Sequence, residues 1–188
     1  MRDLLVPHDP RWKADFEQLR NAYRALLPDL CLDIQHVGST ALPGVCAKPI
    51  LDIDIVVHEA DMMPEITRRL EQAGYLSRGE QGVPGRFAFR QRDQKVPWRD
   101  DHRKWPEHHL YVCLADSLSL KNHIWFRDML LAHPELAAEY SLLKHQLAST
   151  PGMSRETYTL AKTRFILSVL SKAGFSTAEI RSIEEANR

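Results

Sequence analysis

Residues 36–57 read HVGSTALPGVCAKPILDIDIVV, and this stretch decides how the rest of the sequence is interpreted. Its second part, residues 50–57, is mostly β-branched and nearly continuously apolar, which predicts a central strand covered on most of both faces. Only Asp52 and Asp54 interrupt the apolar run. A buried carboxylate is costly unless a cation or a hydrogen-bond donor meets it, so the strand raises the question of what these two side chains bind.

The spacing of the two aspartates predicts that their carboxylates share one face of the strand. Side chains alternate along a strand, so Asp52 and Asp54 project together while Ile53 points to the other side. Two carboxylates at this spacing can reach one divalent cation or a pair of them. Hard oxygen ligands suit Mg²⁺, with Mn²⁺ as the alternative, and water and substrate phosphates complete the coordination shell.

The segment upstream of the strand supplies groups that suit a phosphate. Gly38 allows close approach of the backbone, and the amides and hydroxyls of Ser39 and Thr40 predict a small anion-binding turn. Lys48 adds a cation before the strand. Neither a P-loop nor a GxGxxG motif is present, which argues against ordinary kinases and dehydrogenases. The alternative is an ordinary turn beside an exposed strand face.

This combination resembles the signature of the nucleotidyltransferase superfamily, which includes DNA polymerase β, and more closely the core of the GrpB family. The similarity continues in FRDMLLAHPELAAEY at residues 126–140, and in Lys144, Tyr158 and Lys162. It extends over nearly the whole chain. The resemblance implies a mixed sheet flanked by helices, with the Gly-Ser turn at the phosphates of a nucleotide and the aspartates at Mg²⁺.

Active nucleotidyltransferases usually add a third carboxylate from a neighbouring strand. The corresponding strand here reads HHLYV at residues 108–112 and holds no acid. Tyr111 stands where the GrpB pattern commonly has a histidine. His109, on the same strand face, is our candidate for the catalytic base because its pKa lies near working pH. The alternative is a hydrogen-bonded histidine at a strand end.

The remaining sequence predicts an α+β protein with a helical C-terminal third. Strands are expected at residues 31–37, 50–57, 87–90 and 110–114, and helices at 10–27, 64–73, 119–132, 134–148, 155–173 and 177–187. No Gly/Ser-rich linker divides the chain. We therefore expect one domain over residues 1–188, with a sheet-containing core (1–116) and a helical portion (117–188) packed on it.

Composition places the chain among ordinary globular proteins and limits its partners. The formal net charge is zero, which does not indicate a dedicated nucleic-acid binder. No apolar run is long enough to span a bilayer, so the sequence predicts no membrane contact and a cytoplasmic location. Three widely spaced cysteines, Cys31, Cys46 and Cys113, favour free thiols over a disulfide framework.

Other charged groups have less specific interpretations. Residues 86–104 hold seven Lys or Arg against three Asp, so this segment could fold over a triphosphate or remain a solvated loop; Arg86 and Arg90, at the ends of a strand, are the better candidates. Lys162 is expected to reach a phosphate from the last third of the chain. Arg127 and Asp128, with His123 one turn earlier, could form an ion-pair network that docks helices on the sheet, and a catalytic role is the equal alternative. The spacing of His102, His108, His109 and Cys113 matches no compact zinc motif.

The leading hypothesis is a Mg²⁺-dependent nucleotidyltransferase that moves a nucleoside monophosphate from an NTP to the hydroxyl of an acceptor that the sequence does not specify. Asp52 and Asp54 would hold the metal, with Gly38 and Ser39 at the phosphates. The alternative is a catalytically inactive protein of the same fold that binds a nucleotide or phosphorylated metabolite. Modification of RNA ends is a third interpretation, which draws only on the basic segment.

Overall fold

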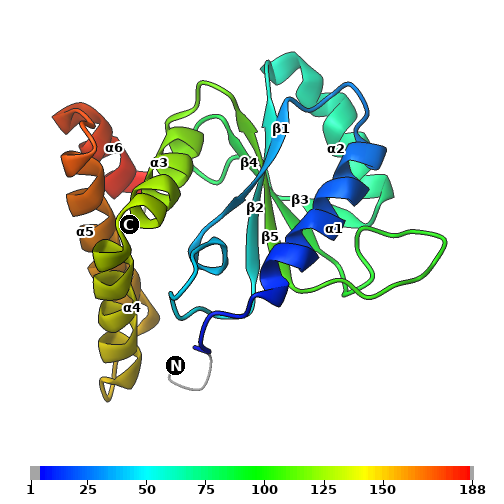
Figure 1. Ribbon diagram of the computed structural model, residues 1–188. Coiled ribbons are helices and arrows are strands. Elements are labelled where there is room, and N and C mark those ends of the chain that lie inside the picture. Colours follow the sequence, from blue (N-terminus) through cyan, green and yellow to red (C-terminus); the bar gives the residue numbers. More distant parts are fainter. Residues whose placement is uncertain (1–4, 187–188) are drawn as a thin grey trace.

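The computed structural model describes residues 5–186 of the chain and shows helices packed on both faces of one sheet (Figure 1). The helices and strands are α1 (Arg11–Leu26), β1 (Asp33–Val37), η2 (Ser39–Ala41), β2 (Leu51–Val57), η3 (Ala60–Met62), α2 (Met63–Gln72), β3 (Tyr75–Ser77), β4 (Arg86–Gln91), β5 (His108–Leu114), α3 (Leu118–Ala132), α4 (Pro134–Ser149), α5 (Arg155–Lys172) and α6 (Thr177–Ala186). The predicted α+β class is confirmed. The residue at which the last helix was expected to end, 187, lies outside the described part of the chain.

The sheet is mixed and has the strand order β1-β2-β5-β4-β3. β2 lies parallel to β5, and the other neighbouring pairs are antiparallel. In this register Asp52 is opposite His109 and Asp54 is opposite Tyr111. The three-residue strand β3 was not expected from the sequence. The register places Asp52 and Asp54 beside the two residues of β5 that were expected to line the same cleft.

One face of the sheet is apolar and is covered by α1 and α2 (Figure 1). Ile53 and Ile55 of β2 and Leu110 of β5 are almost completely buried there. Strand residues with this alternation place every second side chain in the core. His108 belongs to the same face, where its Nε2 lies 2.9 Å from the Tyr23 hydroxyl. Apolar burial on this face is the main source of stability for the sheet.

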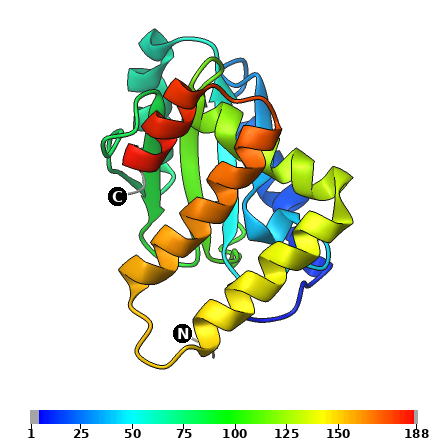
Figure 2. The same cartoon turned by 90° about the vertical axis from the view of Figure 1, so that its left-hand side faces the viewer.

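The opposite face carries the aspartates and is covered by α3 to α6 (Figures 1 and 2). A second apolar cluster joins these helices to Leu42 and Val45, in the loop after the Gly38 turn. Arg127 of α3 donates from one terminal nitrogen to the Gln35 side chain at 2.6 Å and to the His36 carbonyl at 3.0 Å. Arg127 therefore attaches α3 to β1 through hydrogen bonds, and its ion pair is with its neighbour Asp128 in the same helix.

The basic segment after β4 does not approach the aspartates. Residues 92–107 run along the α1 side of the sheet (Figure 1), where Arg103 donates to Gln18 of α1 and Trp105 is buried in the apolar core. Of the interpretations that the sequence left open, folding of this segment over the phosphate site is therefore not supported by the position of residues 92–107. The tryptophan explains the outcome, because burying a large aromatic side chain fixes the loop to the apolar face.

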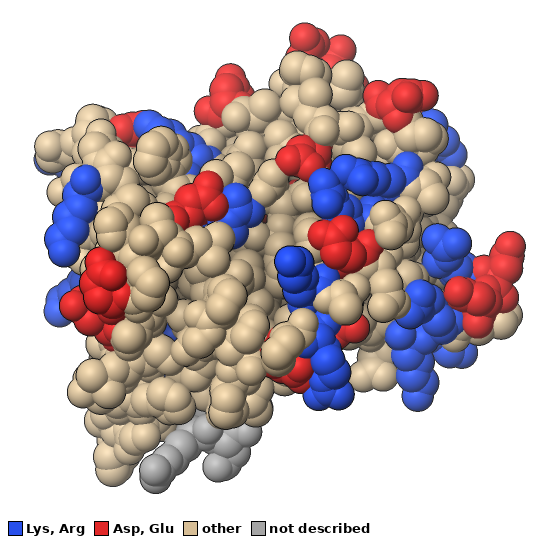
Figure 3. All heavy atoms as spheres, viewed as in Figure 1, with Lys and Arg blue, Asp and Glu red and all other residues tan. Residues whose placement is uncertain are grey.

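All three cysteines are free, as predicted, and Cys46 and Cys113 are buried. Among residues 5–186, no helix combines the length and the apolar character that a membrane crossing requires. On the face shown in Figure 3, basic and acidic side chains are interspersed. That face therefore lacks the continuous positive field that would attract a polyanion from a distance.

Candidate active site

Asp52 and Asp54 project from one face of β2, and each carboxylate meets a histidine. The Asp52 side chain is 33% exposed, and its Oδ1 accepts a hydrogen bond from His109 Nδ1 at 2.9 Å. Asp54 is completely buried, and its Oδ2 accepts from Nδ1 of His123, on α3, at 2.7 Å. The two carboxylates thus share a face, as predicted, but only Asp52 is open to solvent.

His123 is held by its carboxylate partner. Burial of the imidazole lowers its pKa, whereas the charge of Asp54 and the hydrogen bond between them raise it, and the net effect is a pKa above the ordinary value for histidine. A cationic His123 compensates the buried charge of Asp54. The pair therefore provides one answer to the question that the sequence raised about these carboxylates.

The Gly38 turn lies directly against Asp52. Gly38 has a φ of 68°, and a Cβ at this position would lie 2.2 Å from Asp52 Oδ2. Any side chain would displace the carboxylate, so the glycine is required both for its backbone conformation and for the close approach. Next to it, Thr40 is buried with its hydroxyl 3.0 Å from His36 Nε2. Thr40 therefore anchors the turn.

A cleft opens between this turn and the C-terminal helices. Its two connected parts have volumes of about 300 Å³ and 310 Å³, and Ser39, Asp52 and Lys162 line both of them. Lys48, Lys144 and His109 line the first part, whereas Tyr111 and His123 line the second. The cleft thus brings a carboxylate, a hydroxyl and lysine side chains together, which suits a phosphate group with its cation.

Lys144 of α4 is a buried member of this cleft, and its role could not be read from the sequence. Its Nζ donates to the carbonyl of Cys46, and burial lowers the pKa of the amine to about 8. The ammonium fixes the loop before Lys48 to α4. On α5, the Lys162 ammonium lies 5.1 Å from the centre of the Tyr158 ring. Both lysines therefore reach the cleft from the helical part of the chain.

The structure brings most, but not all, of the predicted site residues together. Ser39, Thr40, Lys48, Asp52, His109 and Lys162 line the cleft. Gly38 lines its second part, and Asp54 lies underneath without lining it. Arg86 lines a different cavity, so its predicted contact with the phosphates is not supported by its position. Residues 39, 52 and 162 form the centre of the candidate site.

The strand beside β2 carries no acid on the site face. The residues of β5 on this face are His109, Tyr111 and Cys113, and the Arg86 guanidinium lies 4.8 Å from the centre of the Tyr111 ring. A cation next to Tyr111 occupies the region in which a third metal-binding carboxylate would be expected. The site is therefore limited to the two aspartates of β2 as acidic ligands.

The donor set nevertheless fits a divalent cation. Asp54 Oδ1 is buried and has no hydrogen-bond partner among the described residues, so it is an orphaned acceptor. Each carboxylate gives one oxygen to an imidazole, which leaves Asp52 Oδ2 and Asp54 Oδ1 as candidate hard ligands. Residues 5–186 contain no cluster of three or more His, Cys, Asp or Glu side chains that would hold a metal. Mg²⁺ would therefore depend on water and substrate oxygens, as it commonly does.

The site also contains residues whose part in it sequence reasoning missed. His123 was noted as a docking residue, but its pairing with Asp54 bridges elements far apart in the sequence. Tyr140 lines the cleft near Ser39, and burial raises the pKa of its phenol. The buried polar side chains of the helical third were the one available signal, because such groups need a specific partner.

Comparison with known proteins identifies the family and the fold of this chain. The profile of the GrpB protein family matches residues 4–172. The chain belongs to the GrpB family. The glutamate-rich protein GrpB of Alkalihalophilus pseudofirmus is 31% identical over 170 residues, covering 90% of this chain and 94% of the relative. The UPF0157 protein YqkA of Bacillus subtilis is 28% identical over 162 residues, covering 86% of this chain. This chain spans only 44% of the length of YqkA.

Solved structures extend the comparison from the GrpB family to nucleotidyltransferases. The crystal structure of GrpB from Enterococcus faecalis matches with a TM-score of 0.73 and 28% identity, covering 96% of this chain and 98% of that one. The Cid1 poly(U) polymerase bound to MgGTP matches with a TM-score of 0.53 and 13% identity, over 88% of this chain and 51% of Cid1. The predicted resemblance to GrpB and the nucleotidyltransferase-like fold are both confirmed.

Proposed function

We propose that this GrpB protein moves a nucleoside monophosphate from an NTP to an acceptor hydroxyl in a reaction that requires Mg²⁺ or Mn²⁺. One observation carries the proposal: Ser39, Asp52 and Lys162 line both parts of a single cleft. A carboxylate for the cation thus lies beside a hydroxyl and an ammonium for the phosphates. The similarity in fold to Cid1 supports the same chemistry without establishing it.

Under this proposal, some residues of the cleft bind the metal and others bind the phosphates. Asp52 and Asp54 would hold the cation, which when bound supplies positive charge to the phosphate oxygens during transfer. Ser39 would donate to a phosphate oxygen, and Lys48 and Lys162 would neutralise the β and γ phosphates. The Gly38 turn keeps these groups close, because its backbone lies against Asp52.

His109 would take the proton of the acceptor. Its Nδ1 donates to Asp52, which fixes the tautomer with Nε2 as the basic nitrogen. The acceptor oxygen attacks the α phosphorus, its proton passes to His109, and the bond from the α phosphorus to the bridging oxygen breaks to release pyrophosphate. The Asp52 carboxylate stabilises the imidazolium that forms.

A second candidate is a protein of the same fold that binds a nucleotide or phosphorylated metabolite without turnover. Two observations favour it. Asp54 is completely buried and its Oδ2 is already paired with His123, so its charge has a partner without a cation. In addition, β5 presents no acid to the site face. Such a protein would retain the phosphate-binding groups and would not need the complete metal site.

One set of measurements separates the two candidates. Calorimetric binding of non-hydrolysable NTP analogues with Mg²⁺ is compared between the wild type and Asp52→Asn, with Asp61→Asn, an exposed aspartate outside the cleft, as the control. We expect Asp52→Asn to lose metal-dependent binding and Asp61→Asn to retain it. Pyrophosphate release with an NTP panel and cell extract as acceptor source then decides between transfer and binding alone. Unchanged nucleotide and metal affinity in Asp52→Asn would remove the case for metal-dependent transfer.

A further inference from the structure

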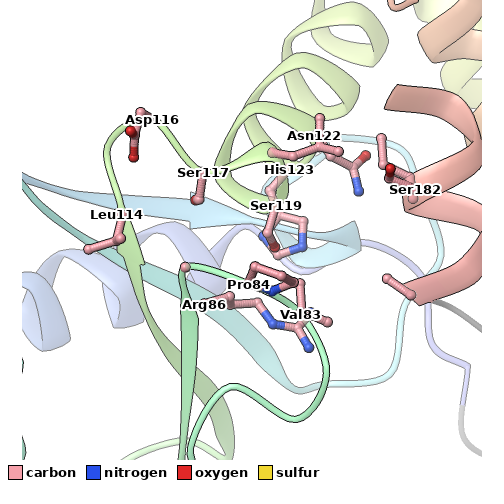
Figure 4. A pocket seen from close by; sticks show the side chains of 14 residues that line it. Val83, Pro84, Arg86, Leu114, Asp116, Ser117, Ser119, Asn122, His123 and Ser182 are labelled. Atoms are coloured by element: carbon pink, nitrogen blue, oxygen red, sulfur yellow. The ribbon is translucent and has the colours of Figure 1, made fainter. Parts of the chain in front are cut away.

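A second cavity, separate from the nucleotide cleft, opens between the β4 and β5 strands and helices α3 and α6 (Figure 4). Its volume is about 430 Å³, which lies in the range of small-molecule sites. It shares Asn122 and His123 with the cleft but contains neither Ser39 nor Asp52 in its walls. The proposed nucleotidyl transfer does not use this cavity, so its chemistry has to be read from its own residues.

The walls combine an apolar majority with a few neutral polar groups. The apolar residues are Val83, Pro84, Leu114, Leu118, Ile183 and Ala186. Ser119, Asn122 and Ser182 add hydrogen-bonding side chains from α3 and α6 (Figure 4). Mostly apolar walls with a small number of polar groups are typical of a pocket that binds the body of an organic molecule and orients it.

Arg86 supplies the single basic Lys or Arg side chain among the described residues of these walls. Its side chain is half-buried, and its guanidinium lies over the face of the Tyr111 ring. Among the described residues, no carboxylate forms an ion pair with it, and its Nε is buried without a hydrogen-bond partner. A guanidinium is always charged, so a half-buried one without a counter-ion is costly. The arginine therefore calls for an anionic partner at the cavity.

The surrounding charges favour an anion with one negative charge over one with two. Asp116 lies at the wall of the cavity, and the buried Asp54 lies close enough to raise the pKa of Cys113, opposite Arg86 on β5. Both acids oppose additional negative charge. One guanidinium balances one carboxylate in a planar two-hydrogen-bond geometry, whereas a phosphate dianion would remain half-compensated.

We infer that this cavity binds an organic monocarboxylate with an apolar body. The carboxylate lies on the terminal nitrogens of Arg86. The apolar body packs against the apolar residues of α3, of α6 and of the loop before β4. The inference goes beyond the proposed function and does not depend on it, because none of the residues that carry it holds metal or phosphate. The shared wall formed by Asn122 and His123 places such a ligand next to the nucleotide cleft.

The test uses 3-phenylpropionate as the probe, with neutral 3-phenylpropan-1-ol and dianionic 2-phenylethyl phosphate as matched probes. Binding to the full chain is followed by calorimetry and by amide shifts in ¹H–¹⁵N spectra. We expect the carboxylate to bind at least about tenfold more tightly than the alcohol, which corresponds to one charge-assisted contact. The shifted amides should include Ser119, Asn122 and Ser182.

Variants then assign the contact. Arg86→Gln should weaken the carboxylate about tenfold and leave the alcohol unchanged. Arg90→Gln removes an exposed arginine from the same strand face outside the cavity, and it should leave both affinities unchanged. Ser182→Trp narrows the cavity from α6 without touching Arg86, and it should weaken both probes. Thermal melting checks that each variant is folded, and Ser182→Trp keeps the test decisive if Arg86→Gln does not fold.

Several outcomes would overturn the inference. Absence of binding by the carboxylate, equal affinity for carboxylate and alcohol, tighter binding of the phosphate, or unchanged carboxylate affinity in a folded Arg86→Gln would each do so. Asp52→Asn should leave probe binding unchanged. Failure of the nucleotide proposal and failure of the carboxylate site are therefore observed independently.

Discussion

His108 and His109 are neighbours in β5 and lie on opposite faces of the sheet. His108 is buried, its Nε2 lies 2.6 Å from the Tyr75 hydroxyl, and burial lowers its pKa to about 4. The His109 side chain is 54% exposed and donates to Asp52. The α1 side of the sheet thus keeps a histidine neutral, whereas the α3 side gives histidines carboxylate partners. The comparison shows that one face packs against an apolar core while the other carries the paired charges of the candidate site.

The largest expected effect is on stability and comes from the apolar face. Leu110→Ala should reduce the free energy of unfolding by about 3 kcal/mol, because it leaves a cavity in the closed core between β5 and the helices α1 and α2. Tyr111→Phe, on the next residue and the opposite face, keeps the ring beneath Arg86 and should cost less than about 1 kcal/mol. Urea unfolding of both variants measures the difference. Equal losses of unfolding free energy would contradict the claim that the apolar face contributes more to stability than the charged face.

The Gly38 turn allows a sharper test on the charged face. Gly38→Ala should cost about 2 to 3 kcal/mol and abolish metal-dependent nucleotide binding, because a methyl group there combines backbone strain with displacement of Asp52. Gly44→Ala is the matched control: Gly44 also has a positive φ, of 79°, but a Cβ there would meet no atom within 4 Å. The control should cost about 1 kcal/mol from strain alone and retain binding. If the two variants lose the same stability and bind the nucleotide equally well, the contact between the Gly38 turn and Asp52 is not needed for binding.

The neutral state of His108 predicts a pH dependence of stability. In the folded protein the His108 imidazole has a pKa of about 4 and stays neutral. In the unfolded chain the same imidazole binds a proton below about pH 6.5. Stability is therefore retained above pH 6.5 and falls as the pH decreases toward 4, by about 2 kcal/mol from this group at about pH 5. His108→Gln should reduce the loss of unfolding free energy between about pH 7.5 and pH 5 by that amount. An identical loss in wild type and variant would show that His108 is not the source.

The smallest expected change in stability is at His109. His109→Gln should alter the free energy of unfolding by less than about 0.5 kcal/mol, because a half-exposed ion pair contributes little in water. Under the proposed function it should still lower the rate of pyrophosphate release, while binding of the nucleotide analogue is retained. Calorimetry and turnover measured on the same preparation separate these effects. A large loss of unfolding free energy would show that His109 contributes to stability as His108 does, and would contradict the contrast between the two faces.

The elements of this fold were largely predictable, and their long-range partners were not. The β-branched side chains of residues 50–57 predicted β2. Ser176 and Glu179 have the spacing of a capping box, and they form reciprocal hydrogen bonds at the start of α6. By contrast, β3 is too short for alternation to be recognised. The direction of residues 92–107 depended on where Trp105 is buried, which local sequence does not encode.

The candidate site likewise has a part that the sequence predicted and a part that depends on long-range packing. The shared face of Asp52 and Asp54 follows from the two-residue period of a strand. The burial of Asp54 beneath His123 depends on how α3 packs on the sheet, and no local pattern specifies that contact. Arg86 shows the limit of charge as a signal: it does lie at the end of a strand, as expected, but it lines another cavity.

The cleft takes its walls from opposite ends of the chain, with the Gly38 turn on one side and Lys162 of α5 on the other. During synthesis, the turn leaves the ribosome long before α5 exists. A nascent chain can therefore form its first strands before the second wall of the cleft has been synthesised. Under the proposed function, a nucleotide would be captured only after α5 has packed on the rest of the chain.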